Sequence, residues 1–372
     1  MLAGPRPDLL DFVAVDIFGV EFTSVCNLKC VYCDVSAPGY KGRHTAQEVL
    51  EAAKKIAEEK RPAFMNFTGI GELTTIPQWT EVVAPFLGLQ GTTKGLTTNL
   101  QKQLDETELA TLVRFDEIAI SIDTADAELL REIRRKSELR NITTNIARIR
   151  AHAIKTGVRP PSLRFNAVVT DRSAPTLFDL CAFAIACGID RVMLIGLNDT
   201  AFFVEQAIVR HVRHLSDQAF MDFVQQIDRG RDLLEAHGKV LTVAADLDAY
   251  IRARLSRQAG GGALQPGQTR LCTQLWTYAV VKEDGRISHC CSNMQSSKSL
   301  REHTFDEIME DEQLRTWRRQ LLEGRELPQE CRTCHWAPPG PPAQLSALVE
   351  RLRAPNLAGR DRFGITAAGV KS

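Results

Sequence analysis

The sequence lacks an excess of charge of either sign. Its 372 residues include 46 Lys and Arg and 46 Asp and Glu, so the formal net charge is zero. This balance argues against a broad basic surface for nucleic acid or for an anionic membrane. Because 25% of the residues are charged and 44% are hydrophobic, the composition is that of a globular chain rather than a disordered one.

Long apolar runs are also missing. No stretch approaches the roughly 18 to 20 apolar residues that a membrane-spanning helix needs. The first residues, MLAGPRPDLLDF, contain no basic segment followed by an apolar one, which is the pattern of a secretory signal. We therefore expect a soluble, cytoplasmic protein with no membrane partner.

Cysteine is well represented, and its ten copies are unevenly placed. A chain of this length can build an apolar core without disulfides, so tight cysteine clusters in a cytosolic protein first indicate metal ligands. Cys26, Cys30 and Cys33 follow the first predicted strand, and five more cysteines lie beyond residue 270. Cys181 and Cys187 are isolated on an apolar predicted helix, and we assign them to core packing.

Short β-branched or aromatic runs alternate with amphipathic segments over the first two hundred residues. Repeated βα units of this kind predict an α/β fold with a parallel sheet. Six units favour a partial (β/α)6 barrel of the TIM type, in which ligands bind at the carboxyl ends of the strands. Strands are predicted at 20–23, 64–67, 95–98, 117–122, 162–169 and 191–195, with one more at 239–244, and helices at 46–60, 126–136, 142–156 and 175–187.

Three regions are expected along the chain. A run of glycines at 260–262 indicates a joint, so the barrel with a helical extension is placed at residues 1–268. A small cysteine-bearing α+β module is expected at 269–338, and a Pro- and Gly-rich linker and tail at 339–372.

The spacing of the first three cysteines favours an iron-sulfur cluster. The loop has the pattern C-x3-C-x2-C and no nearby histidine, whereas a structural zinc site normally takes four protein ligands. Three thiolates can hold a 4Fe-4S cluster and leave one iron without a protein ligand, where chemistry can take place. An unrelated metal or redox loop is the alternative.

This loop, with Tyr32 before its last cysteine, resembles the defining motif of the radical SAM superfamily. The resemblance implies that the open iron binds S-adenosylmethionine and that an electron from the cluster cleaves this cofactor to a 5′-deoxyadenosyl radical. Cys26, Cys30 and Cys33 would then be the catalytic cluster ligands, and Tyr32 would lie at the cofactor. A flavodoxin- or ferredoxin-type protein would supply the electron.

Further segments at predicted strand ends resemble motifs of the same family. After the second strand, Gly69, Gly71 and Glu72 resemble the GGE motif, whose turn contacts the methionine amino group. A protonated amine needs oxygen acceptors, and glycines let a backbone approach it closely. Ile70 stands where glycine is commoner, and Leu73 where proline often follows. Taken alone, this segment is equally an ordinary turn at a strand end.

The next three strands end in polar residues. Asn99 lies in a segment that resembles T-N-G, with Leu100 in place of the glycine. Ser121 and Asp123 are two residues apart on one face of a strand, which suits hydrogen bonds to a diol, and the resemblance implies a place at the cofactor's ribose or the substrate. Asn166 on the fifth strand is a further cofactor-binding candidate. For each residue alone, a strand-end hydrogen bond is the alternative.

Four of the later cysteines form a second pattern, C-x12-G-x4-C followed by C-x2-C, made by Cys272, Cys290, Cys331 and Cys334. It resembles the twitch domain, a shortened SPASM domain, and implies one auxiliary 4Fe-4S cluster with four cysteine ligands and no open iron. A four-cysteine zinc ribbon is the alternative. No cysteine follows Cys334, so a second auxiliary cluster is not expected, and the role of Cys291 stays open.

Within this module the sequence predicts strands at 277–282 and up to residue 290, and one helix at 305–322. Arg315, Arg318 and Arg319 lie among acidic residues on this helix, which we interpret as a surface helix.

A lone twitch cluster resembles the aminocyclitol and sugar-alcohol dehydrogenases and the sulfatase-maturation relatives, in which the auxiliary cluster takes the second electron from the substrate. We therefore expect a radical dehydrogenase that acts on a small polyol or aminosugar. A peptide-modifying or epimerising enzyme is the second hypothesis, although a first strand near residue 20 leaves no room for an amino-terminal peptide-recognition domain. A non-catalytic iron-sulfur electron carrier is the third.

Overall fold

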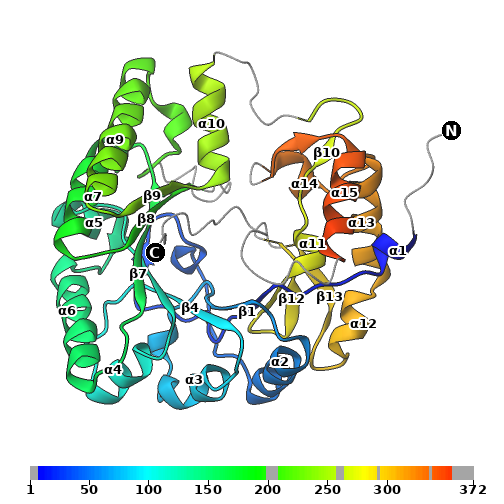
Figure 1. Ribbon diagram of the computed structural model, residues 1–372, viewed down its shortest axis with the longest axis horizontal. Helices are drawn as coiled ribbons and strands as arrows, with labels where there is room; N and C mark the ends of the chain where they lie inside the picture. The colour runs from blue at the N-terminus through cyan, green and yellow to red at the C-terminus, as the bar shows by residue number, and fades with distance from the viewer. Residues whose placement is uncertain (1–6, 198–207, 257–263, 291–293, 335–336, 354–372) are drawn as a thin grey trace.

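One ten-stranded sheet organises the protein, with the strand order β13-β12-β11-β1-β3-β4-β5-β7-β8-β9 (Figure 1). The structure, a computed structural model, describes residues 7–197, 208–256, 264–290, 294–334 and 337–353. The strands from β1 to β9 in this order run parallel, and helices cover their outer face. The predicted α/β partial barrel is therefore confirmed.

Strands and helices alternate along the barrel in the predicted order. The strands described are β1 (Ile17–Val20), β3 (Phe64–Phe67), β4 (Thr93–Thr98), β5 (Glu117–Ser121), β7 (Ser162–Val169), β8 (Arg191–Gly196) and β9 (Val240–Val243). The helices are α2 (Gln47–Lys60), α3 (Trp79–Leu87), α4 (Glu106–Leu112), α5 (Ala127–Ile133), α6 (Leu139–Thr156), α7 (Leu177–Ala186), α9 (Asp217–Ala236) and α10 (Ala245–Leu255). Among the helices of the described ranges, none combines the length and the apolar character needed to cross a membrane.

Alternation along β7 shows how the barrel separates its two faces. Leu163 and Phe165 are buried, and Phe165 stacks on Phe183 of α7 with 5.9 Å between the ring centroids. Since successive residues of a strand point to opposite faces, Arg164 and Asn166 face away from the helices. The inner face of the barrel therefore carries polar side chains at this strand.

The C-terminal module continues the same sheet. β11 (Tyr278–Val281) pairs in parallel with β1, with Val281 beside Val20, and the antiparallel strands β12 (Arg286–Ser288) and β13 (Gln295–Ser299) extend this edge. Barrel and module thus share one sheet, a contact between distant parts of the chain that no sequence pattern predicted. Also described are α1 (Pro7–Leu10), β10 (Thr269–Arg270), α11 (Gln274–Thr277), α12 (Phe305–Met309), α13 (Glu312–Glu323), α14 (Gln329–Thr333), β14 (Pro339–Gly340) and α15 (Pro342–Leu352).

Two predicted elements have different bounds in the structure. The strand predicted at 20–23 ends at Val20, and Thr23 instead forms an antiparallel bridge with His44. The helix predicted at 305–322 is divided into α12 and α13, because Asp311 caps α13 by accepting a hydrogen bond of 2.8 Å from the Gln313 amide.

The region predicted as a linker and tail begins with regular structure. β14 pairs with β10, and α15 packs against α13. The predicted tail from residue 354 onward lies outside the described residues, as does the glycine joint at 260–262. The boundary at residue 268 stays a prediction.

The prediction that the arginine-bearing helix lies at the surface is wrong for Arg318, which is 0% exposed. Its guanidinium donates to the carbonyl oxygens of Leu10 at 2.8 Å, Leu275 at 2.9 Å and Met309 at 3.2 Å. Burial lowers the pKa of Arg318 to about 10. The acidic neighbours in the sequence concealed this residue, because only the opposite face of α13 is solvated.

Candidate functional site

The three cysteines of the first cluster lie in the loop that follows β1, and two short strands hold this loop. β2 (Lys29–Cys30) pairs antiparallel with β6 (Arg134–Arg135), and the Val31 amide donates to the Ile133 carbonyl oxygen at 2.9 Å. The Cys33 amide donates to the Cys30 carbonyl oxygen at 3.1 Å. The backbone around the thiols is therefore set before any metal binds.

The chemistry of these thiols fits an iron-sulfur cluster. Burial raises the pKa of Cys26 to about 11 and of Cys30 to about 12, and the nearby Cys33 contributes to both shifts. Thiols that resist ionisation alone become thiolates when a metal binds them. Among the described residues, no three His, Cys, Asp or Glu side chains are close enough for a single metal ion, whereas a four-iron cluster binds each thiolate through a different iron.

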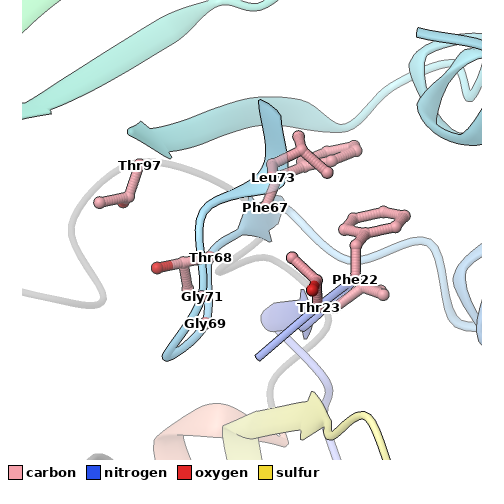
Figure 2. Close-up of a pocket in the computed structure, with 9 residues that line it drawn as sticks. Phe22, Thr23, Phe67, Thr68, Gly69, Gly71, Leu73 and Thr97 are labelled. Carbon is pink, nitrogen blue, oxygen red and sulfur yellow. The ribbon is translucent and has the colours of Figure 1, made fainter. Parts of the chain in front are cut away.

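The glycine turn after β3 lies directly against the start of the cysteine loop. The Glu72 amide donates to the Val25 carbonyl oxygen at 2.8 Å. A Cβ added at Gly71 would lie 2.5 Å from the same oxygen, and one at Gly69 would lie 2.6 Å from Oε1 of Glu21. Figure 2 shows Gly69 and Gly71 beside Thr23, at a small pocket between the ends of β1, β3 and β4. Glycine is needed at both positions because only a bare backbone fits.

The Glu72 carboxylate is buried and already receives several hydrogen bonds. It accepts from the Thr74 hydroxyl at 2.9 Å, the Thr98 hydroxyl at 2.8 Å and the Asn99 amide at 2.7 Å. Burial raises the pKa of Glu72, and these donors oppose the rise. Glu72 thus joins the ends of β3 and β4, and its predicted bond to the methionine amino group stays a prediction.

Asp123 is 0% exposed, and four donors occupy its two carboxylate oxygens. Nε and Nη2 of Arg134 donate at 2.9 and 2.7 Å, the Tyr32 hydroxyl at 2.6 Å, and the Val168 amide at 2.9 Å. The Arg134 guanidinium also lies over the Tyr32 ring, 5.6 Å from its centroid. Burial raises the pKa of Tyr32 well above its usual value. Asp123 therefore fixes the end of the cysteine loop to the barrel.

Arg134 belongs to the site although no sequence motif indicated it. It stands in the cationic run Arg134, Arg135 and Lys136, which is typical of a solvated helix end. Only the pairing of β2 with β6 brings Arg134 beside Cys30. A single sequence offers no signal for this contact.

Asn99, Ser121 and Asn166 are brought to the same side of the sheet by the strand register. Nδ2 of Asn99 donates to Oδ1 of Asn27 at 2.7 Å and lies 3.9 Å from the Cys26 sulfur. Ser121 and Asn166 are direct neighbours on β5 and β7. Oδ1 of Asn166 is buried without a hydrogen-bond partner in the described structure. A buried, unsatisfied amide oxygen fits a polar ligand group.

The four cysteines of the second pattern line one cavity. Cys272, Cys290, Cys331 and Cys334 surround an empty volume of about 470 Å³. Burial raises the pKa of Cys272 and Cys331 to about 12, and the neighbouring thiols contribute. The donor set is therefore all sulfur and closed, which fits a four-cysteine cluster.

Arg270 supports this second site from below its ligand loop. The residue is 3% exposed, and its guanidinium donates to the carbonyl oxygens of Cys331 at 3.0 Å, Arg332 at 3.1 Å and Ala337 at 3.2 Å. Its positive charge lies near the thiols of Cys331 and Cys334. The sequence gave no indication of this role, because Arg270 precedes the pattern.

Two other cysteines lie in the helical layer. Cys181 is buried in α7, where its sulfur would be 2.7 Å from a Cβ added at Gly230 of α9. Cys187 is half-buried at the end of the same helix. Both positions agree with core packing, and Cys291 lies outside the described residues.

Comparisons with known proteins agree with this geometry. Residues 20–164 match the radical SAM superfamily, and residues 272–335 match the SPASM iron-sulfur cluster-binding domain. A probable GTP 3′,8-cyclase of Sulfolobus acidocaldarius is 25% identical over 203 residues, which are 50% of this chain and 62% of that protein. The chain thus spans less than two thirds of the curated relative that it matches.

Solved structures show the same fold. SuiB of Streptococcus suis bound to S-adenosylmethionine has a TM-score of 0.62 and 16% identity, with coverage of 85% of this chain and 73% of that one. The sulfatase-maturation structure anSMEcpe with bound AdoMet has a TM-score of 0.55 and 17% identity, with coverage of 86% and 83%. The chain therefore belongs to the radical SAM superfamily, carries a C-terminal SPASM-type domain, and takes S-adenosylmethionine and 4Fe-4S clusters as cofactors.

Proposed function

We propose that the protein is a radical SAM oxidoreductase that removes hydrogen from a carbon of its substrate and passes the second electron to the auxiliary cluster. The observation that carries the proposal is the closed set of four cysteines that line one cavity. Four thiolates leave no iron open for the substrate, which favours electron transfer over direct ligation. When bound, the first cluster and S-adenosylmethionine supply the abstraction of a hydrogen atom.

The chain's own residues bind and orient these groups. Cys26, Cys30 and Cys33 hold the first cluster, and Asp123 fixes their loop through Arg134 and Tyr32. The turn at Gly69 and Gly71 presents bare backbone to the methionine end of the cofactor, while Asn99, Ser121 and Asn166 offer amide and hydroxyl groups to its ribose. Cys272, Cys290, Cys331 and Cys334 hold the auxiliary cluster. A flavodoxin- or ferredoxin-type protein would donate the first electron.

A small polyol or aminosugar is the substrate class that we propose. The neutral polar side chains at the ends of adjacent barrel strands, such as Thr97, Ser121 and Asn166, suit a ligand with several hydroxyl groups. They also lie on the side of the sheet where the cofactor residues gather.

A peptide is the second candidate substrate, and the solved relatives favour it. SuiB bound to its precursor peptide SuiA has a TM-score of 0.63 to this chain, and anSMEcpe was solved with bound peptides at a TM-score of 0.53. A shared fold leaves both substrate classes open to one assay.

The test is hydrogen transfer from labelled substrate. Anaerobically reconstituted protein is reduced with dithionite, given S-adenosylmethionine, and offered deuterated polyols and aminosugars or deuterated peptides. The expected result is deuterium in 5′-deoxyadenosine with a polyol or aminosugar, together with a product two hydrogens lighter. Deuterium transfer from peptides alone would replace the polyol proposal with the peptide one. Complete absence of 5′-deoxyadenosine would instead favour an electron carrier.

A further inference from the structure

One buried ion pair joins the barrel to the C-terminal module. Glu21 directly follows β1, Lys282 directly follows β11, and the Glu21 amide donates to the Val281 carbonyl oxygen at 2.9 Å. Nζ of Lys282 lies 2.6 Å from Oε2 of Glu21. The Glu21 side chain is 0% exposed and that of Lys282 is 12% exposed, so water screens this pair little.

The other oxygen of Glu21 faces the glycine turn. Oε1 accepts a hydrogen bond from the Ile70 amide, which lies between the two glycines. The turn cannot move toward Glu21, because Gly69 already packs against this carboxylate. One side chain therefore contacts the C-terminal module with one oxygen and the turn with the other.

The turn is tied in the same way to the cysteine loop. The Glu72 amide bonds to the Val25 carbonyl oxygen, one residue before Cys26. Contacts thus run from Lys282 through Glu21 to the turn and from the turn to the first cluster ligand. Lys282 itself stands in the hairpin whose second strand, β12, leads to Cys290 of the auxiliary site.

Other charged groups near Glu21 make Lys282 its main support. Burial raises the pKa of Glu21, and the charge of Lys282 opposes this rise. Glu283 lies beside Glu21 and raises its pKa further, while it pairs with Arg43 at 3.6 Å. Without Lys282, a buried carboxylate would face a second carboxylate and no cation of its own.

We infer that Lys282 and Glu21 are positioning residues for S-adenosylmethionine, so that the C-terminal module shapes the cofactor site of the barrel as well as holding the auxiliary cluster. The inference rests on the proposed role of the glycine turn in binding the cofactor. It gives the module a contribution to cofactor affinity that does not pass through electron transfer.

The test is a double-mutant cycle with Lys282→Met and Glu21→Gln. Dissociation constants for S-adenosylmethionine are measured anaerobically by calorimetry on the oxidised holoenzyme, with iron content and melting temperature as separate readouts. Each single variant leaves one buried charge unpaired and should weaken binding by roughly tenfold. The double variant, in which the glutamine oxygen still accepts from Ile70, should return to within about threefold of the parent.

The matched control is Lys298→Met, which breaks the pair of Lys298 with Asp311 at 3.0 Å in the same module, away from the turn. It should leave cofactor affinity unchanged. If the Lys282 and Glu21 variants lower the melting temperature but keep the parent's affinity, the pair is only structural and the inference is overturned. If Gly71→Ala also binds the cofactor normally while it holds its iron, the assignment of the turn fails instead.

Discussion

At the scale of single residues, Asp123 shows how a buried carboxylate can serve a cofactor without touching it. Its oxygens already accept four hydrogen bonds, two of them from Arg134. A ribose hydroxyl would have to compete with these donors in a fully buried place. The geometry therefore favours a role in holding the cysteine loop.

Asp123→Asn should separate the two roles. The substitution leaves the Arg134 guanidinium buried beside a neutral amide, which should lower the free energy of unfolding by about 3 kcal/mol. Because Tyr32 loses its acceptor, iron binding at the three-cysteine site should also fall. The measurements are thermal unfolding and iron content after reconstitution. Normal stability and iron with weaker cofactor binding would instead make Asp123 a direct ligand.

Asn166 carries the opposite expectation. Its Oδ1 atom is buried without a partner, so Asn166→Leu removes an unsatisfied polar group and should leave the stability of the ligand-free protein equal or higher by up to about 1 kcal/mol. The same change should weaken S-adenosylmethionine binding by roughly 1 to 3 kcal/mol, since a ligand group loses its acceptor. Unfolding in urea and calorimetric titration check the two parts. A variant that binds the cofactor as well as the parent would exclude Asn166 from the site.

At the scale of elements, the sequence predicted best where a pattern reports its own environment. The strands at 64–67 and 162–169 were predicted with the observed bounds, because alternating burial is written in their side chains. The end of β1 was missed because Glu21 is recruited by Lys282, a partner far along the chain. The glycine turn could be recognised as a motif, but Arg134 and Arg270 could not, since their roles come from tertiary contacts alone.

Helix α13 provides an element-scale prediction through Arg318. Arg318→Leu leaves the carbonyl groups of Leu10, Leu275 and Met309 buried without this donor, which should cost about 3 kcal/mol or more. The matched control is Arg319→Leu on the same helix, whose side chain is 40% exposed and 3.6 Å from Glu312, and it should change stability by less than about 0.5 kcal/mol. Urea unfolding of both variants checks this. Equal losses would mean that helix propensity, not the buried contacts, controls the effect.

At the scale of the whole molecule, two cysteine sets are built on one sheet. The first set follows β1, and Cys290 follows β12, two strands away in the sheet order. This common support predicts that the two sites load independently. The reconstituted protein should hold about eight irons, and replacement of Cys26, Cys30 and Cys33 by alanine should leave about four. Iron and sulfide analysis checks the numbers, and a loss of all iron in the triple variant would contradict two separate clusters.

Replacing Cys331 and Cys334 by alanine should uncouple the two halves of the proposed reaction. Cleavage of S-adenosylmethionine needs only the first cluster and one electron, so it should continue. Product formation should fall, because the substrate loses the acceptor for its second electron. The measurement is the ratio of oxidised product to 5′-deoxyadenosine, made on protein whose melting temperature shows that it is folded.

The control for this double variant is the structural cost of losing a cluster. A four-cysteine site also cross-links its module, so unfolding of the module would lower both activities together and leave their ratio unchanged. Because β11 and Lys282 connect the module to the cofactor turn, such unfolding should also weaken S-adenosylmethionine binding. A lower ratio at normal cofactor affinity is therefore the result specific to electron transfer. A parental ratio in folded protein would make the auxiliary cluster a scaffold and favour epimerisation or rearrangement over oxidation.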